Sequence, residues 1–341
     1  MDFAQGLDFP STFWLMIAPP AWGKTHQLLS LLTNSPDTLF VFISPLRALA
    51  NEFYGKTKDQ YSVLLITESQ SWKNFSERHQ LVIVTPETCG NSIEMLSASA
   101  KKILFVLDEF HLYFYWGTTF REIMWECLIN VLVTEQPVLA LTATLAPEQE
   151  VFFLEQMKNQ VHLVIKMNYG NQKLLHLPKQ SIFIPKIWKD KSDWLVQHEL
   201  EKSSRGCVLF FVAFRSDVDR FKVFFENQGY LVLTCVGGEA SLFADQLKKN
   251  PAPDLIISTT VLSHGVNLPQ IRAVIFNYKL NNLDFWVQMV GRGGRKGEKY
   301  FLYSHDLFSF TRWRMFISLV KLTGILGLRF LFPWNESANQ N

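Results

Sequence analysis

The chain alternates short, almost uniformly apolar runs with longer polar stretches. In the first half, runs of this kind follow Phe13 and lie at Thr38–Ile43, Val63–Thr67, Leu81–Thr85, Ile103–Leu107 and Gln136–Leu141. In the second half they lie at Val208–Val212, Leu231–Thr234, Leu255–Ser258 and Ala273–Phe276. Runs of this length without polar alternation predict strands buried on both faces, which are typical of parallel sheets joined by helices. The pattern therefore predicts an α/β protein with two parallel sheets, each flanked by helices.

This rhythm breaks between residues 161 and 186, where turn-forming residues gather around Gly170, Pro178 and Pro185. We interpret this stretch as a hinge. A length of 341 residues fits two domains of ordinary size. The predicted organisation is a first domain over 1–160, a linker over 161–186, a second domain over 187–305 and a helical tail over 306–341.

Within the tail, apolar residues recur at helical spacing, at Phe310, Trp313, Phe316, Ile317 and Val320. The expected reason is one buried helix face, packed on the protein or on a partner and not in a membrane. The alternative is that Trp313, with Arg312 and Arg314, forms a stacking and phosphate surface for single-stranded nucleic acid.

Composition narrows the class of protein only a little. Hydrophobic residues make up 48% of the chain and charged residues 19%, so extended disorder is not expected. The net charge of +2 permits a nucleic-acid partner without indicating one. The four cysteines lack the spacing of a zinc site or a disulfide framework, and the N-terminus lacks a signal sequence. Reduced thiols and a cytoplasmic location are expected.

The first apolar run ends at Ala18 and continues as Pro19-Pro20-Ala21-Trp22-Gly23-Lys24-Thr25. A strand that turns through Gly-Lys-Thr into a helix is typical of a phosphate-binding loop, because backbone N–H groups and the helix dipole face the anion. Lys24 is predicted to reach the β- and γ-phosphates, and Thr25 to bind Mg²⁺. Ala18 replaces the first glycine of the usual motif, and a chance Gly-Lys-Thr on a surface turn is the alternative.

Another apolar run, Ile103–Leu107, leads directly into Asp108-Glu109-Phe110-His111. Two carboxylates at the tip of a buried strand suit nucleotide hydrolysis, in which the first holds Mg²⁺ and the second activates water. In isolation, a strand that simply exits to solvent through acidic residues is the common alternative. The pairing with Lys24 and Thr25 favours the hydrolytic roles for Asp108 and Glu109.

Polar residues follow other predicted strands as well. Arg47 lies near a strand end, where open α/β sheets bind ligands, although a solvated helix arginine is the alternative. In the second half, Arg292 and Arg295 lie three residues apart among glycines and would share one face of a helix start. A phosphate-tolerant basic turn is the alternative to a pair of arginine fingers.

In order and spacing, these segments resemble the motifs of superfamily 2 helicases. From motif I to motif VI, the matching stretches are Lys24-Thr25, Ser44–Glu52, Thr85-Pro86-Glu87, Asp108–His111, Thr142–Thr144, Phe214–Ser216, Thr259–Pro269 and Gln288–Arg295. Three of these motifs look most similar to those of DExH proteins of the Ski-type branch: Pro-Leu-Arg-Ala-Leu-Ala, Gly-Val-Asn-Leu-Pro and Gln-Met-Val-Gly-Arg-Gly-Gly-Arg. DEAD-box proteins would show Asp at the fourth position of motif II and His at the start of motif VI.

The resemblance implies two RecA-like P-loop domains that close on ATP and Mg²⁺ in the cleft between them. Single-stranded or partly duplex DNA or RNA would lie across both domains. Glu109 would be the general base and Gln288 would position water, with Arg292 and Arg295 as arginine fingers. The resemblance also implies three sets of ligands: Pro20, Ala21, Trp22, Gly23, Lys24, Thr25 and Asn267 for the nucleotide; Thr25 and Asp108 for the metal; and Arg47, Thr85, Phe214, Arg215 and Thr260 for the nucleic-acid backbone.

The implied function is an ATP-dependent helicase or translocase of the DExH type. The alternative is a nucleotide-switched binding subunit of a larger machine, such as a CRISPR-associated or mobile-element complex, without autonomous unwinding. Ski-type relatives usually carry winged-helix and ratchet domains, for which residues 306–341 leave no room. A protein partner that supplies accessory or nuclease function is therefore expected. A kinase or GTPase is disfavoured, because neither fold requires the segment Gln288–Arg295 in a second domain.

Overall fold

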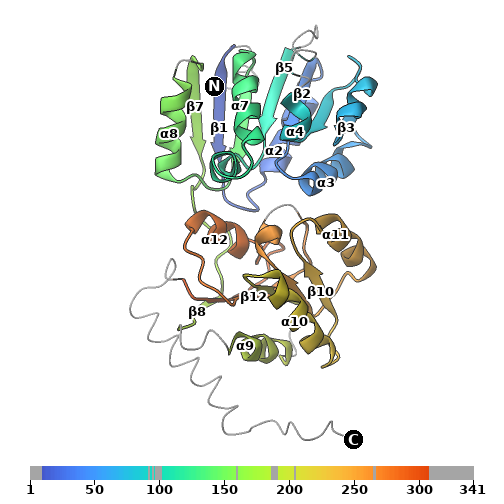
Figure 1. Cartoon of the computed structure of the whole chain (residues 1–341), viewed down its shortest axis with the longest axis vertical. Helices are drawn as coiled ribbons and strands as arrows, with labels where there is room; N and C mark the ends of the chain where they lie inside the picture. The colour runs from blue at the N-terminus through green and yellow to red at the C-terminus, as the bar shows by residue number, and fades with distance from the viewer. Residues whose placement is uncertain are drawn as a thin grey trace, which may run out of the picture. The chain divides into compact units, whose positions relative to one another are not determined.

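The computed structural model describes residues 10–90, 93, 96, 102–158, 160–185, 191–202, 205–263 and 266–306, with the backbone alone at 69–71 and 263. The chain divides into two compact units, Met1–Leu175 and His176–Asn341 (Figure 1). The predicted tail lies outside the described residues from residue 307 onward, and so do both roles considered for it. Within the described part of the chain, no helix has the length and apolar character needed to cross a membrane.

The first unit is built on one parallel sheet of seven strands in the order β3-β4-β2-β5-β6-β1-β7. Its strands are β1 (Thr12–Ile17), β2 (Thr38–Ile43), β3 (Val63–Ile66), β4 (Leu81–Val84), β5 (Lys102–Leu107), β6 (Val138–Thr142) and β7 (Leu163–Asn168). Its helices are α2 (Lys24–Asn34), α3 (Arg47–Thr57), α4 (Pro86–Cys89), α6 (His111–Tyr115), α7 (Ile123–Val133) and α8 (Pro147–Met157), with a 3₁₀ turn, η1 (Ser69–Asn74). The strands predicted from the apolar runs are confirmed.

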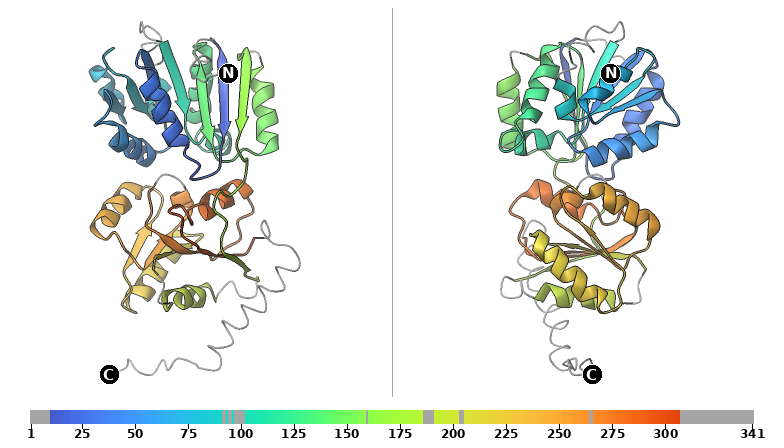
Figure 2. Two further views of the ribbon diagram at one scale, coloured as in Figure 1. Left: turned by 180° about the vertical axis from the view of Figure 1, so that it is seen from behind. Right: turned by 45° about the vertical axis from the view of Figure 1, so that its right-hand side comes forward.

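Helices cover both faces of this sheet (Figure 2). On one face, α2 and α3 pack Leu28, Leu32 and Phe53 against alternate strand residues such as Trp14 and Phe40. On the other face, three aromatic rings meet between β1, α8 and the turn after β5. The ring centroids of Phe13 lie 5.5 Å from Phe110 and 4.7 Å from Phe153. Burial on both faces explains why the central strands carry few polar residues.

The second unit contains a parallel sheet of six strands in the order β10-β11-β9-β12-β13-β8. Its strands are β8 (Gln180–Phe183), β9 (Cys207–Phe211), β10 (Val232–Cys235), β11 (Leu255–Ser258), β12 (Ile271–Phe276) and β13 (Phe301–Ser304). Its helices are α9 (Ser192–Leu200), α10 (Arg215–Glu226), α11 (Ala240–Lys249) and α12 (Leu283–Val290), with a 3₁₀ turn, η4 (Thr260–Ser263). The core of α9, α10 and the strands includes Leu195, Phe221, Phe225 and Tyr303.

Three strands were not predicted: β7, β8 and β13. Strands β7 and β8 each form an edge of their sheet. In β7, Leu163 is exposed and the next two residues are only half-buried, so its sequence is not a uniform apolar run. Both strands lie within the predicted linker 161–186. That segment therefore contains an edge strand of each sheet, and residues 169–179 connect the two.

Candidate functional site

The strand order brings three of the predicted segments together in the first unit. Because β5, β6 and β1 are neighbours and run parallel, the loops that follow them meet at the carboxyl edge of the sheet. Backbone hydrogen bonds join them directly: Ala18 N donates to Thr142 O at 3.0 Å, and Phe110 N donates to Leu141 O at 2.9 Å. The phosphate-loop segment, the acidic pair and Thr142–Thr144 therefore form one site.

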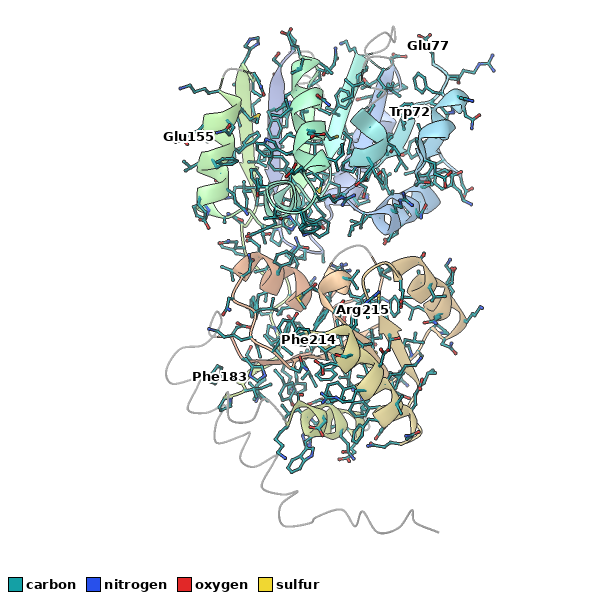
Figure 3. The ribbon with its side chains drawn as sticks, viewed as in Figure 1. Trp72, Glu77, Glu155, Phe183, Phe214 and Arg215 are labelled. Atoms are coloured by element: carbon teal, nitrogen blue, oxygen red, sulfur yellow. The ribbon has the colours of Figure 1, made fainter. Side chains whose placement is uncertain are left out.

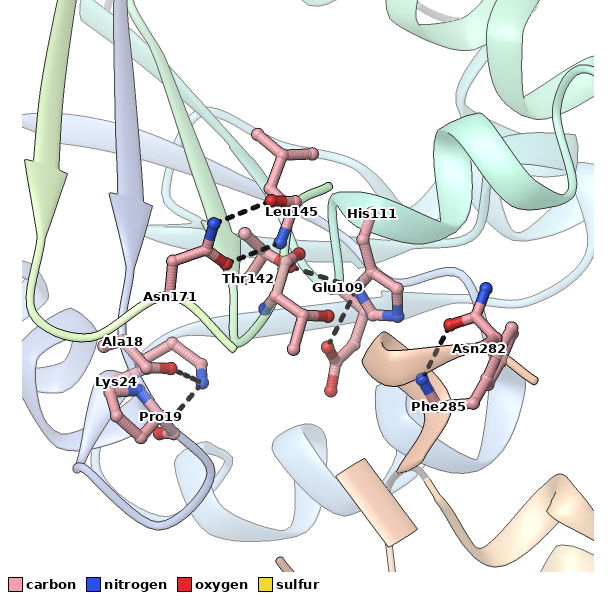
Figure 4. A network of polar contacts seen from close by, with 11 residues as sticks. Ala18, Pro19, Lys24, Glu109, His111, Thr142, Leu145, Asn171, Asn282 and Phe285 are labelled. Carbon is pink, nitrogen blue, oxygen red and sulfur yellow. Dashed lines mark hydrogen bonds and ion pairs between the residues drawn. The ribbon is translucent and has the colours of Figure 1, made fainter. Parts of the chain in front are cut away.

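The phosphate-loop segment has the backbone shape that anion binding requires. Gly23 adopts φ +104° at the N-cap of α2, and Ala21 adopts φ +66°, so the backbone reverses direction around the loop. The ammonium of Lys24 folds back over the loop and donates to Ala18 O at 2.8 Å and, more weakly, to Pro19 O at 3.5 Å (Figure 4). Thr25, in the first turn of the helix, is exposed. A phosphate can replace the carbonyl partners of Lys24.

Residues just after β7 hold this loop from the side. The indole of Trp22 stacks on the ring of Tyr169, with centroids 4.4 Å apart and an angle of 26° between planes. Gly170 has φ +136°, and a Cβ there would lie 3.1 Å from the Pro19 ring. The Asn171 side chain accepts from Leu145 N at 2.9 Å and donates to Leu145 O at 2.7 Å (Figure 4). The start of the connecting segment therefore contacts both the loop and the turn after β6.

The acidic pair lies at the end of β5. Asp108 is half-buried, and burial together with the neighbouring charge of Glu109 raises its pKa to about 7, although Lys24 acts in the opposite direction. Glu109 adopts φ +45°, a conformation that costs a non-glycine residue about 1–2 kcal/mol. Backbone strain at the end of β5 indicates that function requires the Glu109 side chain to point in this direction.

His111 connects this pair to the turn after β6. Its Nδ1 lies 3.0 Å from Thr142 Oγ1 and 3.6 Å from Glu109 Oε2, and the ring is fully buried (Figure 4). Thr142 Oγ1 donates to Thr144 O at 2.7 Å, so its hydroxyl proton is already used. The threonine oxygen therefore accepts from Nδ1–H, which fixes the tautomer of His111 and turns the ring toward Glu109.

The residues predicted to hold Mg²⁺ suit that ion chemically. A carboxylate whose pKa is raised by burial and by a second carboxylate gains most from a nearby divalent cation, and Mg²⁺ prefers oxygen ligands. Asp108 supplies such an oxygen, and the exposed hydroxyl of Thr25 supplies a second at the start of α2.

The two nucleic-acid residues predicted in the first unit differ in accessibility. Arg47 is exposed at the start of α3. Thr85 is only 1% exposed and caps α4, where its backbone N–H donates to Thr88 Oγ1 at 3.1 Å. Thr85 is thus part of the hydrogen-bonded turn that begins α4.

In the second unit, the predicted nucleic-acid residues gather at the carboxyl edge of its sheet. Phe214 and Arg215 follow β9 at the start of α10 (Figure 3). Thr260 follows β11, the neighbour of β9. Phe214 is 68% exposed, and Thr260 is exposed. The Arg215 guanidinium donates to Gly237 O and lies 3.6 Å from Glu239 Oε1. Asn267, predicted to contact the ribose, is exposed as well.

The motif VI residues do not lie as predicted. Asn282 caps the start of α12 by accepting from Asp284 N and Phe285 N (Figure 4), and the helix ends at Val290. The two arginines therefore follow the end of a helix, and the prediction that they share a helix start was wrong. Gln288 and Arg292 are both 3% exposed, whereas Arg295 is exposed.

The buried arginine joins two motifs of the second unit. Arg292 Nη1 donates to Val266 O at 2.8 Å, next to Asn267, so it holds the turn after α12 against motif V. Arg295 Nε donates to Gly291 O at 3.0 Å, and the residue as a whole is exposed. The two arginines thus have different surroundings.

Sequence reasoning missed the residue that shapes this turn. The Glu298 carboxylate accepts from Gly294 N at 3.1 Å, Lys296 N at 2.8 Å and Ile271 N at 3.1 Å. The sequence feature that could have indicated this role is that Glu298 is an acidic residue within a run of basic residues and glycines. Tyr169 and Asn171 were also missed as site residues, because nothing in their local sequence indicates contact with Trp22, 147 residues earlier, or with Leu145, 26 residues earlier.

Comparison with known families agrees with this arrangement. Residues 11–152 match the sequence model of DEAD/DEAH box helicases, and residues 190–297 match that of the helicase conserved C-terminal domain. Together the two matches span more than half of the chain. The chain therefore belongs to the superfamily 2 helicase family.

Individual relatives are distant. The chain is 24% identical over 290 residues to the probable ATP-dependent RNA helicase ddx42 of Dictyostelium discoideum, covering 80% of this chain and 28% of that protein. It is 26% identical over 258 residues to the RecQ-like DNA helicase BLM of Xenopus laevis, covering 71% and 18%. The chain thus spans less than a third of either relative. Neither match singles out the DExH or Ski-type branch.

Among solved structures, the fold resembles S. cerevisiae Dbp5 bound to RNA and ADP BeF3. The TM-score is 0.66 and the identity 18%, over 92% of this chain and 83% of that one. A likeness at this identity concerns the fold, which is that of two RecA-like domains.

Proposed function

We propose that this chain hydrolyses ATP with Mg²⁺ and uses the cycle to translocate on, or unwind, nucleic acid. One observation carries the proposal: the loop that holds Lys24, the carboxylates of Asp108 and Glu109, and the Thr142–Thr144 turn meet at one sheet edge. The arrangement can bind a triphosphate, hold a cation beside it and present a base to water, which are the requirements of phosphoryl transfer.

In this proposal each residue has a defined task. Lys24 leaves the carbonyl oxygens of Ala18 and Pro19 to contact the phosphates. Thr25 and Asp108 would hold Mg²⁺, which would supply positive charge beside the phosphates. Glu109 accepts the proton of the attacking water, and His111 keeps that carboxylate in position. Pro20, Ala21, Trp22 and Gly23 contribute backbone and packing around the nucleotide.

The second unit would complete the site. Arg295, which is exposed, is the candidate arginine finger for the γ-phosphate. Arg292, which is buried against Val266 O, holds the arginine turn and thereby positions Arg295 and Asn267. Gln288 belongs to the same motif and would act on the attacking water once the domains close.

We further propose that the chain is of the DExH type, with motifs most similar to the Ski-type branch. His111 stands at the fourth position of motif II and Gln288 at the start of motif VI, where DEAD-box proteins would carry Asp and His. The bond from His111 Nδ1 to Thr142 gives that histidine a structural task in the ATP site.

Single-stranded DNA or RNA is the proposed nucleic-acid substrate. The exposed residues Arg47, Phe214, Arg215 and Thr260 lie at the carboxyl edges of the two sheets, and they offer charge, an aromatic ring and hydroxyl groups to a backbone. The relatives named above include both an RNA and a DNA helicase, so both substrates must be tested.

ATP turnover measured with single-stranded DNA, with single-stranded RNA and without nucleic acid, each over a salt series, tests the proposal. We expect stimulation by at least one strand and loss of that stimulation as salt rises. Turnover that no nucleic acid changes would contradict it. Stimulated turnover without unwinding of a tailed duplex would instead favour a nucleotide-switched subunit that requires a protein partner.

A further inference from the structure

The turn that carries the two arginines of motif VI packs on a tyrosine that none of the motifs includes. Residues 291–295 form this turn, which we call the arginine turn. Tyr300 directly precedes β13, and its side chain is fully buried. A Cβ built on Gly293 would lie 2.5 Å from the Tyr300 ring, and one built on Gly294 would lie 3.2 Å from it. Glycine allows this close approach of backbone to ring, so the ring of Tyr300 supports the arginine turn.

His176, in the segment that connects β7 to β8, packs on the same turn. Gly294 adopts φ +76°, and a Cβ there would lie 2.7 Å from the His176 Cβ. The Tyr300 hydroxyl donates to the backbone oxygen of His176 at 3.0 Å. Lys179 N donates to Tyr300 O at 2.8 Å. Tyr300 therefore binds the connecting segment through its side chain and its backbone, and it contacts the arginine turn through its ring.

Little apolar burial attaches the connecting segment at this point. On either side of His176, Leu175 is 45% exposed and Leu177 is 76% exposed. The hydrogen bond from the Tyr300 hydroxyl therefore matters more here than it would in a packed core. Burial, and to a smaller extent the charge of Glu298, raises the pKa of Tyr300, so the hydroxyl keeps its proton and remains a donor.

The arginine proposed to act on the nucleotide belongs to this turn. Arg295 directly follows Gly294, and its Nε donates to Gly291 O at 3.0 Å, so its guanidinium is fixed to the backbone of the turn. A change in how the turn packs on Tyr300 and His176 therefore moves Arg295 as well. A misplacement of about 1 Å at a catalytic group can cost on the order of 10²-fold in rate.

The alternative is that Tyr300 is only a core residue that stabilises the second unit. Tyr303, three residues later in β13, is a tyrosine of that kind. It is 1% exposed, it belongs to the core formed with α9 and α10, and its hydroxyl donates to Glu199. The ring of Tyr300 instead contacts the glycines of a motif. Because the two tyrosines share a strand, their burial and a bonded hydroxyl, Tyr303 is a matched control.

We propose that Tyr300 is a positioning residue for ATP hydrolysis: it fixes the arginine turn against His176 and thereby places Arg295 for the γ-phosphate. The inference rests on the proposed function, since it takes Arg295 as the arginine finger. It adds that the placement of this arginine depends on the connecting segment, which the Tyr300 hydroxyl attaches to the turn.

The test is ATP turnover of the full chain at a saturating concentration of a stimulating strand, with kcat and nucleotide affinity measured separately. Tyr300→Phe removes one neutral hydrogen bond and should lower kcat by roughly 2- to 12-fold. Nucleotide affinity should stay that of the wild type, because Arg295 acts on charge that develops in the transition state. Tyr300→Leu also removes the ring and should lower kcat further, by up to about 100-fold.

Two comparisons separate positioning from a purely structural role. When Arg295→Ala is already present, adding Tyr300→Phe should cause no further loss of kcat, because the group that Tyr300 positions is gone. Tyr303→Phe should lower the melting temperature and leave kcat of the folded protein unchanged. Wild-type kcat in Tyr300→Phe would overturn the inference. So would losses from Tyr300→Phe and Arg295→Ala that multiply in the double variant.

Amide hydrogen exchange tests the same contacts without ATP. Tyr300→Phe should speed exchange over residues 172–177 and 291–295, and Tyr303→Phe should not. Unchanged exchange in both stretches would contradict the attachment and overturn the inference. A wild-type chain without ATP turnover would contradict the proposed function instead, and faster exchange in Tyr300→Phe would still support the attachment of the segment to the turn.

Discussion

Trp22 of the phosphate loop stacks on Tyr169, a residue that follows the last strand of the first sheet, with ring centroids 4.4 Å apart. The two residues are separated by most of the first unit in sequence, and Tyr169 N also donates to Ile17 O at 2.8 Å, directly before the loop. The segment that leads toward the second unit therefore begins by packing on the residues proposed to bind phosphate.

The first prediction concerns this stack. Trp22→Ala should weaken nucleotide binding by roughly 2- to 12-fold, because an aromatic pair contributes about 0.5–1.5 kcal/mol beyond its buried area. Tyr169→Ala should cause a similar loss, and the double variant should be little worse than either single one, since both remove the same contact. Titration with a fluorescent ATP analogue measures the three affinities. Losses that simply add would mean that the rings act separately.

The second prediction separates Lys24 from Glu109. Lys24→Ala and Glu109→Gln should both abolish turnover, but only the first should weaken nucleotide binding, because Glu109 acts on water and not on the phosphates. Glu109→Gln should therefore accumulate a nucleotide-bound state that holds single strands more tightly. The measurements are turnover and strand affinity in the presence of ATP. Near-normal hydrolysis by Glu109→Gln would show that another group is the base.

The third prediction contrasts the two arginines of motif VI. Arg295→Ala should reduce turnover on the order of 10³-fold with little effect on nucleotide affinity or melting temperature, because a finger stabilises charge that develops in the transition state. Arg292→Ala should lower the free energy of unfolding by about 1–3 kcal/mol, since it leaves the buried oxygen of Val266 without this donor. Thermal melts and turnover assays together distinguish the roles. A large loss of stability in Arg295→Ala would contradict the assignment.

The fourth prediction follows from the raised pKa of Asp108. Its folded-state pKa of about 7 exceeds the usual value of 3.8, so between these values the folded protein keeps a proton that the unfolded chain has lost. Raising the pH through this window therefore removes stability from the wild type, and above about pH 7 the loss is complete. Asn cannot ionise, so Asp108→Asn should melt on the order of a few degrees higher than wild type near pH 8, without nucleotide or Mg²⁺.

Near pH 4 this advantage of Asp108→Asn should disappear. The exposed Asp37→Asn serves as the matched control for the replacement of one carboxylate by an amide. A difference in melting temperature between Asp108→Asn and wild type that stays constant from about pH 4 to pH 8 would mean that Asp108 is not the group that titrates. Because Asp108 and Glu109 are coupled, the midpoint belongs to the pair.

The amino-acid sequence alone determined the fold class and predicted the residues that we propose for the ATP site. Uniformly apolar runs such as Leu81–Val84 are typical of strands in a sheet that helices cover on both faces. Gly-Lys-Thr after such a strand is typical of a phosphate-binding loop. The order of polar residues at successive strand ends then matches superfamily 2 helicases over most of the chain. Local sequence suffices here because each signal depends on a few consecutive residues.

Tertiary structure alone decided which of these residues can act on a ligand. Arg292 and Arg295 look equivalent in sequence, but one is buried against Val266 O and the other is exposed. Thr85 is predicted to contact a nucleic-acid backbone, and only the structure shows that it is buried at the N-cap of α4. Burial and long-range contacts depend on which strands become neighbours, and a linear pattern does not contain that order.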